Sequence, residues 1–209
     1  MKIKSIQKIQ SNSKRYDLTT SSENFVANNI LVHNSSSTFY NKVENIVDPN
    51  IFGVCSRNID LKETEGNTYW NMAKKYSLQG VLKDKNLSLQ GETHGAGIQK
   101  NKLGLKDIQL AAFDVFDIKE YRYFDYAEMV DFCDKNNIPR VPTIYVGAFK
   151  WKTVDELMEF ADSQNYDNGT PCEGVVIRSV KEMKSEAMKG GRMAIKAISR
   201  RFLLTYGKE

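Results

Sequence analysis

Ile108-Gln-Leu-Ala-Ala-Phe-Asp-Val-Phe-Asp-Ile118 is the stretch that decides the class of fold. Its apolar residues follow one another almost without interruption, which predicts a strand buried within a sheet. Gly174–Arg178 and Met193–Ala197 have the same character, and Leu87–Glu92 and Thr143–Val146 are further predicted strands. The chain is therefore expected to contain several strands that are far apart in sequence.

Helical segments alternate with these strands. Residues 68–76 predict a short helix, and Asp125-Tyr-Ala-Glu128 and Thr153-Val-Asp-Glu156 are capping boxes that open two more. The apolar residues after each box recur at helical spacing, so we expect them to face the core. The combination predicts an α+β fold, in which helices pack on mostly antiparallel sheets.

The N-terminal segment has a different pattern. Residues 2–9 and 14–19 alternate enough to be strands, the turn Ser11-Asn12-Ser13 joins them, and Phe25–Val32 is another strand candidate. This predicts a small all-β unit ahead of the main domain.

Composition sets wide bounds on function. The 209 residues are 41% hydrophobic and carry a formal net charge of +4, which is compatible with nucleic acid as a partner but does not establish it. The three cysteines have no paired spacing, so we expect reduced thiols in a cytoplasmic protein. The sequence shows no signal peptide, no zinc pattern and no stretch that approaches a membrane span.

His33-Asn34-Ser35 is the tripeptide with the most specific chemistry. An asparagine amide nitrogen can attack its own carbonyl, which forms a succinimide and breaks the following peptide bond. A neighbouring imidazole can assist the proton transfers near neutral pH. A hydroxyl after the asparagine can accept an acyl group and pass it to its own amine. A surface turn is the alternative interpretation of the bare tripeptide.

The run that begins at Tyr16-Asp-Leu and ends in Ile30-Leu-Val-His-Asn34 resembles the C-terminal segment of inteins. The resemblance implies that Asp17 supports the splice centre, that His33 assists, that Asn34 cyclises, and that Ser35 is the first residue after the intein. Glu23 stands where the family often has histidine. Only 33 residues precede Asn34, so we expect a split intein whose N-terminal half is carried by a separate chain.

Short motifs follow Ser35 in a characteristic order. They are Ser36–Tyr40, Cys55–Leu61, Gln90–Asn101, Phe113–Ile118, Glu173–Arg178 and Ile195–Ser199. Together they resemble the nucleotidyltransferase motifs of ATP-dependent RNA ligases. The predicted division is an intein fragment over 1–34 and a ligase nucleotidyltransferase domain over 35–209.

The ligase resemblance implies roles for particular residues. Lys196 and Arg57 would contact phosphate, and Glu173 would hold Mg²⁺. Glu92 would engage the ribose of ATP, and Phe113 would stack on adenine. RNA is the implied substrate. Ala194 stands where many relatives have a second lysine.

The first motif of the family is Lys-x-Asp/Glu-Gly followed by Ser-Ser-x-Thr. This sequence contains only the part after the glycine, which begins at Ser35. The gap coincides with the expected splice point. We therefore expect the partner chain to end its ligase portion in Lys-x-Asp/Glu-Gly, and this chain to be inactive alone. No further domain is expected after Glu209.

Several alternatives stay open from sequence. The unspliced chain could be a nucleotide- or RNA-binding protein with a ligase fold, and the finished enzyme could be a DNA ligase or a capping enzyme. Arg57, Lys196, Glu92 and Glu173 could be ordinary surface or strand-end residues. Because side chains of a regular strand alternate, one of Phe113 and Phe116 should face the site and the other the core. His94 is expected in a loop. The cations that could touch a nucleic-acid backbone, or merely be solvated, are Lys100, Lys102, Arg200 and Arg201.

Overall fold

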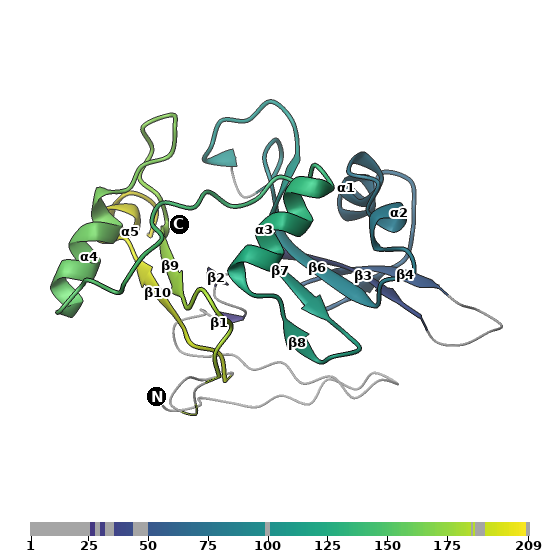
Figure 1. Ribbon diagram of the computed structural model, residues 1–209. Coiled ribbons are helices and arrows are strands. Elements are labelled where there is room, and N and C mark those ends of the chain that lie inside the picture. The colour runs from purple at the N-terminus through teal and green to yellow at the C-terminus, as the bar shows by residue number, and fades with distance from the viewer. Residues whose placement is uncertain are drawn as a thin grey trace, which may run out of the picture.

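The structure is a computed structural model that describes residues 36–43, 50–98, 101–184, 186 and 191–207, together with the backbone of 26–27 and 30–31. A six-stranded antiparallel sheet forms its larger part (Figure 1). The strand order is β5-β4-β3-β6-β7-β8. The strands are β3 (Ser36–Lys42), β4 (Ile51–Ser56), β5 (Asp60–Leu61), β6 (Leu87–His94), β7 (Gln109–Asp117) and β8 (Arg122–Tyr123).

One face of this sheet carries the main core. Phe39 and Leu89, paired across β3 and β6, are completely buried, as is Val54 on β4. Helices α1 (Thr68–Lys75), α2 (Leu78–Leu82) and α3 (Tyr126–Lys135) cover this face and contribute Met72, Leu78, Leu82, Met129 and Cys133. Because strand side chains alternate, Glu92 and Gln90 on β6 point to the opposite face of the sheet.

The second part is a two-stranded antiparallel sheet of β9 (Gly174–Arg178) and β10 (Ala194–Ile198). Helix α4 (Val154–Ser163) packs on it, and Leu157, Ala161, Val175 and Ala197 form a separate small core. Helix α5 (Arg200–Tyr206) follows β10. Figure 1 shows this unit, with α4 outermost, beside the six-stranded sheet.

The predicted α+β class with antiparallel sheets is confirmed. Four of the predicted strands correspond to β6, β7, β9 and β10, and the predicted helix over 68–76 corresponds to α1. The capping box of α3 is complete, with Glu128 Oε2 accepting from the Asp125 backbone N–H at 2.7 Å. At the start of α4, the Thr153 hydroxyl accepts from the Glu156 backbone N–H at 3.2 Å. The Glu156 carboxylate accepts from the backbone N–H of Lys152, at 2.6 Å, and not from that of Thr153 as in a complete capping box.

Two strand predictions are wrong. Thr143–Val146 is not a strand, because its chain leaves the sheet after Val141 and exposes Ile144 and Val146. The segment Phe25–Val32 contains two short strands, β1 (Val26–Ala27) and β2 (Ile30–Leu31), which pair antiparallel with each other. The predicted strands over 2–9 and 14–19 lie outside the described residues.

Candidate active site

Glu173 and Lys196 form an ion pair on the smaller sheet. Glu173 immediately precedes β9, and its carbonyl accepts from the Ser199 backbone N–H at 2.9 Å, which extends the β9–β10 pairing. Lys196 Nζ lies 2.8 Å from Glu173 Oε1, and the lysine side chain is only 6% exposed. Burial lowers the pKa of Lys196, although Glu173 and Glu92 oppose that shift. Lys196 is therefore not a solvated surface charge.

Glu92 brings a second carboxylate to this pair from the larger sheet. Its pKa is raised to about 8, first by burial and second by the negative charge of Glu173, while the positive charge of Lys196 opposes the shift. Glu92 Oε2 is buried and has no hydrogen-bond partner among the described residues. Burying a carboxyl oxygen without a hydrogen-bond donor costs free energy, so such an oxygen indicates a place where a bound ligand would supply the missing contact.

The donor set suits a hard cation. Oxygen ligands are what Mg²⁺ and Mn²⁺ accept, and Mg²⁺ is commonly held by one or two carboxylates together with substrate phosphates and water. Within the described ranges no three His, Cys, Asp or Glu residues are grouped so that they could enclose a metal. Glu173 is thus suited to share a cation with a bound phosphate, not to enclose one.

Phe113 owes its position to an irregularity in β7. Gly91 pairs with Ala112 and Gln90 pairs with Asp114, so Phe113 is the extra residue of a β-bulge. Beyond the bulge, Phe116 pairs with Ser88 on the same face of β6 as Glu92. Phe113 is 5% exposed and belongs to neither core cluster.

The expectation that one of the two rings would face the core is therefore wrong. Alternation along β7 is reset by the bulge, so Phe116 also lies away from the main core. Its ring makes edge contacts with Tyr121 and Tyr123, at centroid distances of 5.4 and 4.9 Å.

Asp114, next to the bulge, anchors two arginines of the smaller unit. Its carboxylate, 3% exposed, accepts from Arg178 Nη1 and from Arg192 Nη1 at 2.9 Å. Arg178 Nη2 also donates to the Phe113 carbonyl at 2.7 Å. These contacts join the two sheets, and sequence analysis did not predict them, although Asp114 and Arg178 lie inside two quoted motifs.

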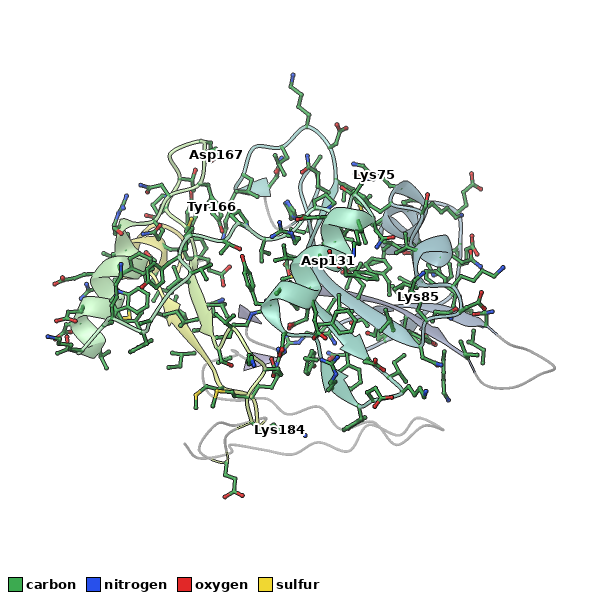
Figure 2. All side chains as sticks on the ribbon, in the orientation of Figure 1. Lys75, Lys85, Asp131, Tyr166, Asp167 and Lys184 are labelled. Atoms are coloured by element: carbon green, nitrogen blue, oxygen red, sulfur yellow. The ribbon has the colours of Figure 1, made fainter. Side chains whose placement is uncertain are left out.

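Tyr166 is a residue near the Glu173 and Glu92 carboxyl groups that the sequence analysis did not single out. It lies in the loop between α4 and β9, near one end of the β9–β10 pair, whereas Lys184 marks the other end (Figure 2). The pKa of Tyr166 is raised to about 12, first by burial and then by Cys172, with smaller contributions from the charges of Glu173 and Glu92, while a hydrogen bond with the Glu173 backbone opposes the shift. The only sequence signal was its place in a turn-rich stretch seven residues before Glu173.

Other predicted residues have different surroundings. Arg57 follows β4 in a half-exposed turn, and His94 ends β6 instead of lying in a loop. Lys102 Nζ lies 4.4 Å from the Phe202 ring centre and 4.7 Å from that of Tyr206. Arg200 Nε bonds Asp162 at 2.6 Å, and Arg201 Nη1 donates to the Asp162 carbonyl at 2.7 Å. The residues that fall outside the described ranges are Asp17, His33, Asn34, Ser35 and Lys100.

The sequence profile of the RNA ligase family matches residues 29–198, which is most of the chain. The chain belongs to the RNA ligase family. No curated protein sequence matches it. Within the described residues, no helix is long and apolar enough to cross a membrane.

Solved structures of a family member, the RNA ligase of Naegleria gruberi, are similar to this chain. A point mutant with ATP and Mn superposes with a TM-score of 0.72 at 27% identity, covering 84% of this chain and 50% of that one. A second point mutant, with AMP and Mn, gives 0.73 at 26% identity, covering 87% and 51%. The form with pyrophosphate gives 0.70 at 27% identity, covering 85% and 50%. The match thus spans about half the length of the Naegleria gruberi ligase chain.

Proposed function

We propose that this chain is the C-terminal part of an ATP-dependent RNA ligase. The finished enzyme would seal 5′-phosphate and 3′-hydroxyl ends of RNA through a lysyl-AMP intermediate. The observation that carries the proposal is the buried Glu92 carboxylate, with one unpartnered oxygen, beside the Glu173–Lys196 pair. The similar Naegleria gruberi ligase has been solved with ATP and Mn, which supports ATP and a divalent cation as ligands here.

The residues of the site have complementary roles in this proposal. Lys196 and Arg57 stabilise negative charge that builds on the α-phosphate. Glu173 holds the divalent cation, Mg²⁺ or Mn²⁺, which supplies further positive charge at the phosphates when bound. Glu92 accepts hydrogen bonds from the ribose, and Phe113 stacks on adenine. The nucleophile that becomes adenylylated is a lysine of the Lys-x-Asp/Glu-Gly motif, which this sequence does not contain.

Protein splicing would supply that lysine. Ser36, the first described residue of β3, pairs with Glu92. A Lys-x-Asp/Glu-Gly sequence joined ahead of Ser35 would therefore enter the sheet next to the Glu92 carboxylate. This register supports a partner chain that carries an intein N-terminal half preceded by the missing motif.

The splicing chemistry would be carried by His33, Asn34 and Ser35, with Asp17 in support. The Ser35 hydroxyl would attack the last carbonyl of the partner's ligase segment, which forms an ester on Ser35 and breaks the bond between that segment and the intein N-terminal half. The Asn34 amide nitrogen would attack its own carbonyl, which releases the Ser35 amine and leaves a C-terminal succinimide on the intein. The ester would then move to that amine and become a peptide bond.

The test is adenylylation with ATP labelled in the α-phosphate. The chain alone with Mn²⁺ should bind ATP but acquire no covalent label. After mixing with its partner, the label should appear on a spliced product that contains residues 35–209. Covalent labelling of the isolated chain would contradict the proposal, and so would a partner that lacks Lys-x-Asp/Glu-Gly.

The second candidate is an unspliced nucleotide- or RNA-binding protein. It is favoured by the fact that Glu92, Glu173 and Lys196 already come together in this chain. ATP binding without any spliced product in the presence of the partner would select it. If DNA ends outcompete RNA ends in the sealing reaction, the enzyme is a DNA ligase. Covalent guanylylation with GTP would instead indicate a capping enzyme.

A further inference from the structure

Arg192 makes an unusual set of contacts at the junction of the two sheets. Its Nη1 donates to Asp114 Oδ2 at 2.9 Å, and its Nη2 donates to Asp114 Oδ1 at 3.1 Å. Its Nε and Nη2 also donate to the two oxygens of Glu182, at 2.6 and 2.8 Å. One guanidinium therefore engages two carboxylates through paired bonds, which a lysine ammonium cannot reproduce.

The surroundings of Arg192 are largely dry. Its side chain is 11% exposed, that of Asp114 is 3% exposed, and that of Glu182 is 18% exposed. Its guanidinium carbon lies 3.6 Å from the ring centre of Tyr123 on β8. Breaking a buried pair leaves an uncompensated charge, so this arrangement resists displacement more strongly than a surface ion pair would.

The contacts join the β9–β10 unit to the larger sheet at the end of the strand pair where β9 ends and β10 begins. The backbone of Glu182 is also held in place, because its N–H donates to Asp125 Oδ1, at the start of α3, at 2.7 Å. At the other end, Asn168 Nδ2 donates to the Lys102 carbonyl at 3.2 Å, between two loops. The Glu92, Glu173 and Lys196 cluster draws residues from both units, so its geometry depends on how firmly they are joined.

Arg192 lies just ahead of the strand that carries Lys196. It precedes β10 by two residues and Lys196 by four. We propose that Arg192 is a positioning residue, which holds the Glu173–Lys196 pair against Glu92 by joining β10 to Asp114. This inference deepens the proposed function, because it assigns a residue that sets the phosphate- and metal-binding groups without touching them.

The decisive variant is Arg192→Lys, which keeps the charge but cannot engage both carboxylates. Arg122→Lys is the matched control, because Arg122 also makes a two-bond pair with a carboxylate, that of Glu128, at 2.7 and 2.8 Å, but this pair is exposed. Glu182→Gln is a milder variant that leaves the Asp114 contact in place. Urea unfolding of each protein establishes that it is folded under the conditions of the assay.

Two measurements separate this inference from the proposed function. The first is the rate at which an amine-specific reagent modifies Lys196, followed by peptide mass spectrometry, which does not depend on ATP. The second is the affinity for ATP with Mn²⁺ by calorimetry. We expect Arg192→Lys to accelerate modification several-fold and to weaken ATP binding by about tenfold, as loss of a supporting contact typically does. Arg122→Lys should change neither, and Glu182→Gln should give an intermediate effect.

The outcomes are distinguishable. Faster modification of Lys196 without ATP binding by any form, wild type included, would leave the positioning role standing and remove the proposed function. Unchanged Lys196 reactivity in folded Arg192→Lys would overturn the positioning role, whatever the ATP affinity. If Arg192→Lys does not fold, an unchanged Lys196 rate in Glu182→Gln would overturn it instead.

Discussion

Lys196 on β10 and Glu92 on β6 belong to different sheets, yet each shifts the pKa of the other's side chain. Glu173 completes the group through its 2.8 Å contact with Lys196 Nζ. This group of one ammonium and two carboxyl side chains is costly to bury. It is well suited to receive a nucleotide phosphate and a divalent cation, which would redistribute the charge.

Removal of the buried ammonium should weaken nucleotide binding. Lys196→Met deletes a charged hydrogen-bond donor, and such donors contribute roughly 1.5–3 kcal/mol, so we expect ATP affinity with Mn²⁺ to fall by about 10- to 100-fold. Lys74→Met is the matched control, because Lys74 pairs with Glu63 on the surface, where the two side chains are 63% and 53% exposed. Equal affinities of the two variants by calorimetry would contradict the assigned role of Lys196.

Stability should fall as the pH rises through the range in which Glu92 titrates. Its pKa is about 8 in the folded chain, against an ordinary value of 4.5. Between these values the folded chain binds more protons than the unfolded chain, so the free energy of unfolding decreases with increasing pH. Glu92→Gln should lack this component. Urea unfolding of both proteins over this range measures the difference, and parallel curves would show that Glu92 does not titrate as described.

The bulge at Phe113 predicts an effect on adenine recognition. Stacking of a base on an aromatic ring contributes roughly 1–3 kcal/mol, so Phe113→Ala should weaken ATP binding by about 5- to 100-fold. Pyrophosphate binding should not change, because it offers no base. Phe116→Ala, which removes the contacts with Tyr121 and Tyr123, should affect stability instead. Equal loss of ATP affinity in both variants would argue against stacking on Phe113.

The splicing proposal depends on Asn34. Asn34→Ala removes the amide nitrogen that attacks the carbonyl, so the mixture with the partner chain should contain no excised intein carrying a succinimide and no ligated product of residues 35–209. Intact-mass spectrometry of the mixture detects both species. Asn12→Ala, in the predicted turn over 11–13, is the control and should splice normally. Accumulation of mature ligase from the Asn34 variant would refute the mechanism.

Lys102 should contribute to stability more than to RNA affinity. Its ammonium lies over the Phe202 and Tyr206 rings, and a cation–π contact contributes about 0.5–2 kcal/mol. Lys102→Ala should therefore lower the urea midpoint and leave the salt dependence of RNA binding unchanged. Lys106→Ala, at an exposed position of the same loop, serves as the comparison. A shallower salt dependence for Lys102→Ala alone would indicate a phosphate contact after all.

The amino-acid sequence was sufficient for several local features, and its motifs predicted the chemistry of the site. Apolar runs located β6, β7, β9 and β10 because a buried strand needs apolar residues, and capping residues located α3 and α4 because helix ends need hydrogen-bond partners. The strands β3, β4, β5 and β8 were not predicted, and the two edge strands β5 and β8 are too short to carry a periodic signal. Glu92, Glu173 and Lys196 were identified by family motifs, and the structure brings them together.

Only the tertiary structure decided which side of the sheet Phe113 and Phe116 occupy, because a bulge arises from pairing with β6 and not from β7 itself. It also decided the partners of Asp114, since Arg192 is 78 residues away in the chain. The raised pKa of Glu92 has the same origin: it requires burial and charges from another sheet. Local patterns report on neighbours along the chain, whereas electrostatic coupling and register depend on distances that exist only after folding.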